Sequence, residues 1–383
     1  MADDGATVRG FRSFFEDPNV RFPKKPRLVE DVAIYQMPDG LGVQFRGGPA
    51  ATVLRGREAE KVLGFLLPAL DGNRGLADLI ERCPAGISTA TLLQALHVLH
   101  TKGLLCEGDQ NPVSLPEVST IAPDVTLQRQ LLFWGRKLRI TGCNDYSRDV
   151  QAKLESRNIL IVATGLFGTA TADLLLRTGC SRLRVIAWDD SGVVADSLAN
   201  SNNGCPIATI SRVCVDDAIA SVRDFLESAD LVVTATRNAP IELFRSLNRM
   251  CLDFARPLLC ADEDGVQLVL GPFIQPYSSA CYTCLELRRA SVTEFMLEEH
   301  LYQTHLLRER TSGRSKPIGE ALPFATLSAS LVVSEVIRIV TAIEPPTVVN
   351  GQLTLPLLAG EPQVNRILRV PRCPDCQRGG RTS

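Results

Sequence analysis

Residues 158–168 read Asn-Ile-Leu-Ile-Val-Ala-Thr-Gly-Leu-Phe-Gly, a mostly apolar run that contains two glycines. This content predicts a buried parallel strand over Asn158–Val162 and a tight turn over Ala163–Gly168. Thr169–Thr178 then has helical character, and Leu183–Trp188 is predicted to be a second strand. Strand, glycine turn, helix and strand form one βαβ unit, so the sequence predicts an α/β fold of Rossmann type.

Two glycines and one acid in this region match positions of a nucleotide-binding pattern. In dinucleotide-binding proteins, a Gly-x-Gly-x-x-Gly turn brings phosphate to a helix N-terminus, and an acid about twenty residues later binds ribose. Gly165, Gly168 and Asp189 match three of these positions, whereas Ala163 replaces the first glycine. The pattern therefore favours the fold over nucleotide binding. An NAD-dependent oxidoreductase is disfavoured, because the chain has no motif for a catalytic acid or a hydride-donor pocket.

Later segments extend this α/β domain to the end of the chain. Leu231–Ala235 and Pro257–Ala261 are predicted to be buried strands, and Leu322–Thr341 is predicted to be a long apolar helix. We assign residues 151–383 to this domain.

Two Cys-x-x-Cys pairs lie in the same domain: Cys281 with Cys284, and Cys373 with Cys376. Four thiolates at this duplicated spacing favour one structural zinc ion. The alternatives are a redox dithiol at the second pair or four unrelated buried cysteines. A redox motif normally opens a helix, whereas the second pair runs into the tail Gln377–Gly380. With four protein ligands no position is left for substrate, so we expect zinc to stabilise the fold rather than to catalyse.

An N-terminal domain is predicted over residues 28–110, between a flexible arm over residues 1–27 and a connector with a helix over residues 111–150. Its predicted elements are three short strands and then three helices: Val32–Tyr35, Gly42–Phe45, Ala51–Leu54, Glu58–Leu70, Leu76–Arg82 and Thr89–Lys102. A small sheet followed by three helices is a winged-helix plan.

A winged-helix domain commonly binds DNA, which is the default alternative function for this part. Its third helix offers Lys102 as a positive charge, whereas a recognition helix needs several to contact phosphates. The whole chain has a formal net charge of −2, so neither nucleic acid nor an anionic membrane is an expected partner. His97 and His100 on this helix have no third ligand near them in the sequence, which favours a surface or groove position over a metal site.

Length and cysteine usage indicate an intracellular globular protein. The 383 residues suffice for two or three domains. The N-terminus lacks a signal-peptide pattern, and no uninterrupted apolar run looks long enough to cross a bilayer, so we expect a cytoplasmic protein. The cysteines outside the two pairs are scattered singly among apolar residues, which favours buried free thiols in a reducing compartment.

The C-terminal domain resembles the ThiF/ubiquitin-activating superfamily. The resemblance lies in the order of its motifs: the glycine turn, the acid Asp189, the Val-Val-Thr-Ala-Thr strand that ends at Thr236, a helix with Leu247-Asn248, and the two cysteine pairs. The N-terminal domain resembles the PqqD-like RiPP recognition element through its three strands and Leu70-Asp71-Gly72 between two helices. Together they resemble the ocin-ThiF-like, or C-type, proteins, which are leader-peptide-binding partners of YcaO-type cyclodehydratases in thiazole/oxazole-modified peptide biosynthesis.

The resemblance implies an adenylating site, and most of its residues are replaced. Asp189 matches the ribose-binding acid, but the arginine that contacts the ATP phosphates is Asn200 in this chain. No lysine is found over residues 154–315, where a phosphate-binding lysine should follow. Arg237 replaces the magnesium-binding acid, which reverses the charge at the metal position. Gly165, Gly168 and Asp189 are therefore interpreted as a vestigial nucleotide site, and ATP is not an expected cofactor.

These observations predict a non-catalytic scaffold. The leader of a ribosomal precursor peptide would add as a strand beside the third predicted strand and pack against the third helix. The ThiF-like domain would dock a YcaO-type ATP-dependent cyclodehydratase, which forms azolines in the core peptide. The predicted peptide-binding residues are Ala51, Thr52, Val53, Leu54, Arg55, Leu93, His97 and His100. The alternative is an ATP-dependent adenylating enzyme of the ThiF class that acts on a peptide carboxylate. The sequence leaves open whether the chain forms a homodimer.

Overall fold

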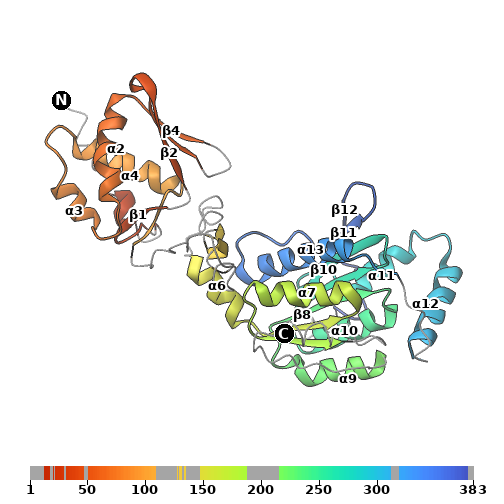
Figure 1. The fold of residues 1–383 in the computed structure, drawn as a ribbon. Coiled ribbons are helices and arrows are strands. Elements are labelled where there is room, and N and C mark those ends of the chain that lie inside the picture. Colours follow the sequence, from red (N-terminus) through yellow and green to blue (C-terminus); the bar gives the residue numbers. More distant parts are fainter. Residues whose placement is uncertain are drawn as a thin grey trace. The chain divides into compact units, whose positions relative to one another are not determined.

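The computed structural model describes residues 13–17, 20, 22–29, 32–46, 51–108, 127, 129–131, 133–134, 147–187, 215–311 and 319–377. The chain divides into two compact units, residues 1–151 and residues 152–383 (Figure 1).

The first unit contains a three-stranded antiparallel sheet and three helices, at the positions that the sequence predicts. The strand order is β2-β3-β4, and a 3-10 turn over Pro38–Gly40 joins the first two strands. The elements are β2 (Ala33–Met37), β3 (Gly42–Arg46), β4 (Thr52–Arg55), α2 (Arg57–Ala69), α3 (Leu76–Glu81) and α4 (Thr89–Thr101). Local signals explain them: Ser88, for example, caps α4 by accepting the N–H of Thr91 at 3.1 Å.

A second small sheet in this unit is absent from the sequence prediction. β1 (Pro26–Leu28) pairs antiparallel with β5 (Leu105–Glu107). The Glu107 carboxylate also accepts hydrogen bonds of 2.8 Å from the backbone N–H groups of Lys24 and Lys25. The predicted flexible arm is therefore wrong at its C-terminal end, which this sheet holds. Strands of three residues are too short for a hydrophobic period to indicate them.

The core of the first unit lies between the three-stranded sheet and helices α2 and α4. Its buried side chains include Phe45, Val62, Leu63, Leu66, Leu92, Leu96 and Leu99. Their spacing within each helix is the three-to-four residue period of an amphipathic helix. This packing buries one face of the sheet and leaves β4 at its edge.

The second unit is an α/β domain built on a seven-stranded sheet of order β12-β11-β10-β9-β8-β6-β7. Its strands are β6 (Ile159–Ala163), β7 (Leu183–Ala187), β8 (Leu231–Arg237), β9 (Leu258–Glu263), β10 (Gln267–Ile274), β11 (Gly351–Pro356) and β12 (Gln363–Arg366). β7, β6, β8 and β9 are parallel, whereas β9 to β12 pair antiparallel. The sequence predicts the parallel half, whose strands are mostly apolar and buried, but not β10, β11 and β12.

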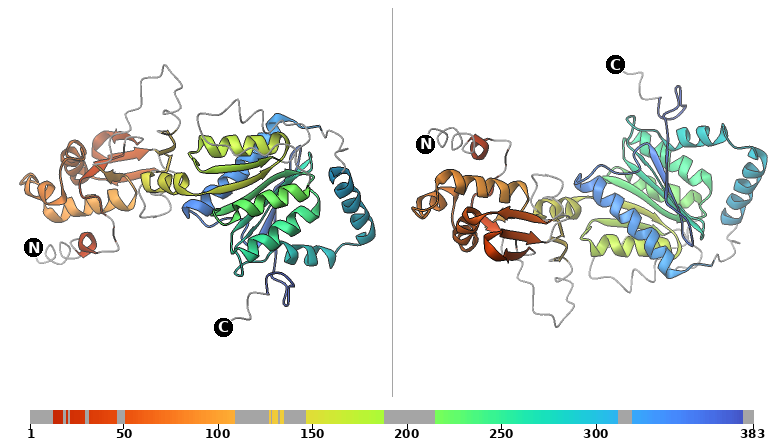
Figure 2. Two further views of the ribbon diagram at one scale, coloured as in Figure 1. Left: turned by 90° about the horizontal axis from the view of Figure 1, so that it is seen from below. Right: turned by 90° about the horizontal axis from the view of Figure 1, so that it is seen from above.

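Helices cover both faces of this sheet (Figure 1, Figure 2). α7 (Gly165–Arg177) and α13 (Leu322–Thr341) pack together on one face, and α9 (Val215–Leu226) and α10 (Ile241–Asp253) lie on the other. α11 (Tyr282–Ala290) packs against α10, and α12 (Met296–Thr311) follows it. α6 (Ser147–Ser156) precedes β6.

α13 is long and apolar enough to cross a membrane by length and composition alone, although Glu335 and Arg338 interrupt its apolar run. Its inward side chains are nevertheless buried: Ala325, Ala329, Val332 and Val336. The helix also packs against α7 and β9. Such packing is typical of a core helix in a globular domain.

The glycine turn after β6 is shorter than predicted. Thr164 is the N-cap residue of α7 and the helix begins at Gly165, so most of the predicted turn is helical. Gly165 has a φ of +61°, which L side chains rarely adopt. A Cβ on Gly168 would lie 2.8 Å from the Cβ of Ala163. One positive φ therefore turns the chain, and the second glycine allows close packing of helix on strand.

Candidate functional site

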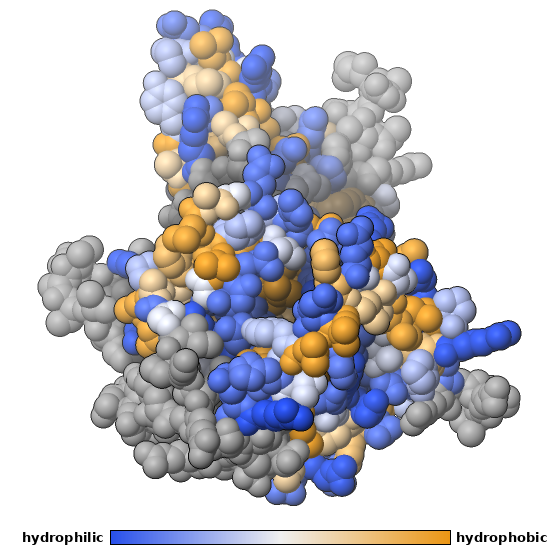
Figure 3. Space-filling view, turned by 90° about the vertical axis from the view of Figure 1, so that its right-hand side faces the viewer, coloured by the Kyte–Doolittle hydropathy of each residue, from blue (hydrophilic) through white to orange (hydrophobic). Residues whose placement is uncertain are grey.

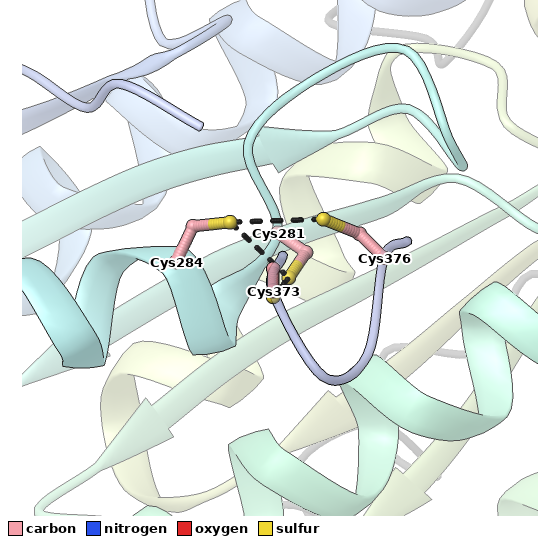
Figure 4. A group of neighbouring side chains, drawn as sticks. All are labelled: Cys281, Cys284, Cys373 and Cys376. Carbon is pink, nitrogen blue, oxygen red and sulfur yellow. Dashed lines mark hydrogen bonds between the residues drawn. The ribbon is translucent and has the colours of Figure 1, made fainter. Parts of the chain in front are cut away.

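The four cysteines of the two Cys-x-x-Cys pairs meet in one buried cluster (Figure 4). Cys281 is the N-cap residue of α11 and Cys284 lies in its first turn, whereas Cys373 and Cys376 follow β12. All four sulfurs lie within 4.8 Å of one another, and three of the Sγ–Sγ distances are 3.6, 3.7 and 3.8 Å. Zinc binds thiolates at about 2.3 Å, so the sulfurs of a tetrahedral site lie about 3.8 Å apart. The cluster therefore has the size and the donor set of a structural zinc site.

The pKa values of Cys284 and Cys376 are shifted in opposite directions by their buried surroundings. A hydrogen bond from Cys281 lowers the pKa of Cys284 to about 4, and the backbone N–H of Val370 also points to this sulfur at 3.4 Å. Burial raises the pKa of Cys376 to about 11. Four thiolates this close together would need a positive charge among them, which a divalent cation would supply.

A polar network ties the second cysteine pair to the rest of the domain. Asp375, inside that pair, is buried and accepts hydrogen bonds from Thr283 on α11 and Asn248 on α10. Asn248 in turn accepts a hydrogen bond of 3.0 Å from the backbone N–H of Tyr282. The C-terminal turn is therefore held by α10 and α11 as well as by the cysteines.

The start of α7 is an anion site that the chain fills with its own carboxylate. Glu320, just before α13, accepts a hydrogen bond of 2.8 Å from the backbone N–H of Leu166. A Cβ on Gly165 would lie 2.3 Å from Oε1 of Glu320, so the carboxylate lies directly against this glycine. Helix N-termini after glycine turns bind phosphate in nucleotide-binding folds. In this protein the Glu320 carboxylate lies on that helix end.

Arg237, at the end of β8, holds the Glu320 carboxylate in place. Its Nη1 lies 2.9 Å from Oε1 of Glu320, and the two side chains are 5% and 15% exposed. Its Nη2 donates to the carbonyl of Gly319 at 2.6 Å, and its backbone N–H donates to Oγ1 of Thr164 at 2.7 Å. Burial raises the pKa of the carboxyl of Glu263 on β9, whereas the charge of Arg237 acts in the opposite direction. The guanidinium of Arg237 thus interacts with two buried carboxyl groups, those of Glu320 and Glu263.

The predicted nucleotide residues are only partly described. Gly165 and Gly168 lie at the start of α7, as a nucleotide turn requires. Asp189 and Asn200 lie outside the described residues. The role of Glu320 is not indicated by the sequence, because it is far from both α7 and Arg237 along the chain and belongs to no motif.

A cavity of about 140 Å³ lies beside the ends of β8 and β9. Asp262 lines it, and its carboxylate accepts hydrogen bonds from Oγ1 of Thr236 at 2.8 Å and from the N–H of Ala239 at 3.3 Å. Arg289 lines it as well and donates to Gln352 at 2.7 Å. The cavity therefore presents both signs of charge, which suits a small polar group. No sequence motif indicates it.

The strand predicted to bind peptide lies at an edge of its sheet. β4 contains Thr52, Val53, Leu54 and Arg55, and the exposed Ala51 directly precedes it. It pairs with β3 and is the last strand in the order β2-β3-β4. An edge strand presents backbone N–H and C=O groups with which another strand can pair.

The structure corrects the prediction that Leu93 lines an open groove, because Leu93 is fully buried. His97 and His100 lie on the same ridge of α4, at helical spacing from Leu93, and are half-buried. The ring of Phe14 lies 4.4 Å from that of His97 and 5.9 Å from that of His100. Burial lowers the pKa of His100, and the nearby His97 acts in the same direction. A segment of the predicted arm thus covers this ridge.

Apolar side chains are exposed on and before α12. Figure 3 shows apolar residues interspersed with hydrophilic ones on the side of the molecule to which this helix belongs. The large apolar side chains exposed on this segment are Val292, Phe295, Met296, Leu297, Leu301 and Tyr302. The segment therefore presents a partly apolar surface.

Comparisons with known proteins agree with this architecture. Residues 189–377 match the ThiF family. The microcin C7 biosynthetic enzyme MccB in complex with N-formylated MccA superposes with a TM-score of 0.65 at 18% identity, over 92% of this chain and 99% of that chain. E. coli MccB with ATP gives 0.64 at 17% identity over the same shares, and PaaA gives 0.59 at 16% identity over 89% of this chain and 100% of that chain. At these identities the similarity establishes the fold alone. No curated protein matches the sequence.

Proposed function

We propose that this chain, whose residues 189–377 form a ThiF family domain, is a non-catalytic scaffold that binds the leader of a ribosomal precursor peptide. It presents that peptide to a YcaO-type ATP-dependent cyclodehydratase, which converts side chains of the core peptide to thiazolines or oxazolines. The observation that carries the proposal is the Glu320 carboxylate on the N–H of Leu166, paired with Arg237. Phosphate binding at this helix end would require the displacement of a carboxylate that is already neutralised.

The loss of positive charge around the nucleotide turn supports the same conclusion. Phosphoryl transfer depends on positioned cations and a metal ion that offset the charge of the transition state. In this chain Asn200 replaces an expected arginine, and no lysine is present over residues 154–315. The guanidinium of Arg237 is already engaged with Glu320 and Gly319.

Peptide binding is proposed to use β4 (Thr52–Arg55). A leader that adds as a strand forms main-chain hydrogen bonds whatever its sequence. Contacts of its side chains then determine which leader sequences bind. Binding of the leader raises the local concentration of the core peptide at a docked enzyme, so the cyclodehydratase itself needs little affinity for it. The bound MccA of the MccB complex is consistent with a peptide partner for this architecture.

The scaffold proposal predicts that Val53→Pro weakens leader binding about tenfold to 100-fold, if roughly two hydrogen bonds of about 0.5–1.5 kcal/mol each are lost. Proline removes a backbone N–H and disfavours regular strand pairing. Fluorescence anisotropy with labelled leaders of short peptides encoded beside this gene measures the change.

Val53→Thr is the matched control, because threonine keeps both the N–H and the branched Cβ, and its affinity should stay within about twofold of wild type. Thermal melts establish that both variants are folded. Equal affinities for the proline and threonine variants, or preferential binding of duplex DNA, would refute the assignment of β4 to peptide binding.

A second candidate function is ThiF-type adenylation with a displaced metal ligand, and Asp262 is the observation that favours it. Asp262 is on β9, and its carboxylate accepts a hydrogen bond from Thr236 on the neighbouring strand β8. The carboxylate also lines a cavity to which Arg289 contributes. In such a reaction a peptide carboxylate attacks the α-phosphorus of ATP, which forms an acyl adenylate and releases pyrophosphate.

The scaffold proposal predicts no magnesium-dependent pyrophosphate exchange by the wild-type protein above that of a heat-denatured sample, with or without peptide. Exchange that is lost on Asp262→Asn but retained on Glu242→Gln would establish the adenylating function instead. Glu242 is a suitable control because it is a half-exposed acid of the same unit, paired with Arg245.

A further inference from the structure

An aromatic cluster joins the N-terminal segment Ser13–Phe22 to α4. Phe14 contacts His97 and His100 edge to face, and Phe22 lies 5.2 Å from His100 at an angle of 60°. Phe15 links the two, with ring centroids 5.2 Å from Phe14 and 4.7 Å from Phe22. Edge-to-face contacts of this kind stabilise one specific arrangement of the rings, which nonspecific apolar contact does not.

Backbone hydrogen bonds join near neighbours within this segment. The N–H of Asp17 donates to the carbonyl of Phe14, that of Val20 to Asp17, and that of Phe22 to Val20. Residues 13–16 form a helical turn whose acidic end, Glu16 and Asp17, is exposed. Regular pairing with the domain begins only at β1 (Pro26–Leu28). The phenylalanine rings therefore provide the contact with the ridge of α4.

We propose that the N-terminal segment that carries Phe14, Phe15 and Phe22 is a built-in ligand of the α4 ridge at His97 and His100, and that a binding peptide displaces it. The occupant indicates the chemistry of the competitor: a peptide with a pair of adjacent aromatic side chains next to acidic residues. That the competitor is a precursor leader rests on the proposed function, whereas occupancy of the ridge does not. A ligand that must displace this segment binds more weakly, because its association constant is multiplied by the fraction of protein molecules in which the ridge is open.

The contact itself is tested in the full-length protein with histidine-selective NMR. Phe14→Ser/Phe22→Ser removes the rings nearest to the two α4 histidines, so the ring-proton signals of His97 and His100 should shift. His300 and His305 on α12 are internal controls and should not move. Unchanged signals of His97 and His100 would overturn the proposal.

Displacement is tested with a labelled synthetic peptide of residues 11–25 as the probe. The full-length Phe14→Ser/Phe22→Ser variant should bind this peptide at least about tenfold more tightly than the wild type, in which the segment already occupies the ridge. The same peptide with serine at positions 14, 15 and 22 is the control and should bind neither protein. Equal affinity for wild type and variant, or no binding by either, would overturn the displacement.

These outcomes separate the inference from the proposed function. If the probe binds as expected but no leader binds at β4, the built-in ligand stands and the scaffold function fails. If leaders bind in a manner that depends on β4 but are unaffected by Phe14→Ser/Phe22→Ser, the scaffold function stands and the built-in ligand fails.

Discussion

Replacing Cys373 and Cys376 together by alanine is expected to abolish zinc binding and to leave residues 152–383 unfolded at room temperature. Structural zinc sites contribute about 10–16 kcal/mol in small peptides, whereas a domain is stable by only about 5–15 kcal/mol. The free energy that is lost with two of the four ligands is therefore larger than the stability that the rest of the core can provide. Elemental analysis should give one zinc per wild-type chain and none for the variant, and circular dichroism should report the unfolding.

Cys251→Ala/Cys260→Ala is the matched control. Both cysteines are fully or almost fully buried in the same unit, but neither belongs to the group of four. This variant should lose at most about 0.5–3 kcal/mol per site and keep its zinc. Wild-type protein without zinc, or a stably folded Cys373→Ala/Cys376→Ala variant, would show that the cluster is not a metal site.

Arg237→Ala is expected to destabilise the second unit by about 3–5 kcal/mol, as typically follows when one partner of a buried ion pair is removed. The change leaves the carboxylates of Glu320 and Glu263 buried without the guanidinium that faces them. Urea unfolding followed by fluorescence or circular dichroism measures the free energy of unfolding.

Arg177→Ala is the control for loss of an arginine. Arg177 pairs with Asp173 on α7, but its side chain is 68% exposed, so its removal should cost less than about 1 kcal/mol. Adding Glu320→Gln to Arg237→Ala should recover part of the lost stability, because the two residues act as a unit. Additive losses in the double variant, or an Arg237→Ala protein as stable as wild type, would contradict the ion pair.

The Glu320–Arg237 pair also accounts for the polar groups at the N-terminus of α7. The N-terminus of α7 carries partial positive charge and N–H groups that need an acceptor. Glu320 supplies one acceptor and Arg237 neutralises its charge. This pair therefore stabilises the start of α7 from within the chain.

The sequence by itself determined those features whose signals are local. The apolar run Ile159–Ala163, followed by Gly165 and Gly168, predicts the βαβ unit, because parallel strands are buried on both faces. The helical periods of residues 57–101 predict α2, α3 and α4. The two Cys-x-x-Cys spacings predict that the four cysteines lie together, because one metal-binding geometry accounts for both spacings. The replacement of an acid by Arg237 is likewise visible without a structure.

Only the tertiary structure decided which distant groups meet. β1, β5 and β12 are short or polar strands without a hydrophobic period, so their pairing depends on neighbours from elsewhere in the chain. Leu93 looks like a groove residue on a helical wheel, but the wheel does not show that Phe14 covers the adjacent ridge. The hydrogen bond from Leu166 to Glu320 spans 154 residues. Such contacts arise from the folded arrangement of both partners, and neither partner's local sequence encodes the other.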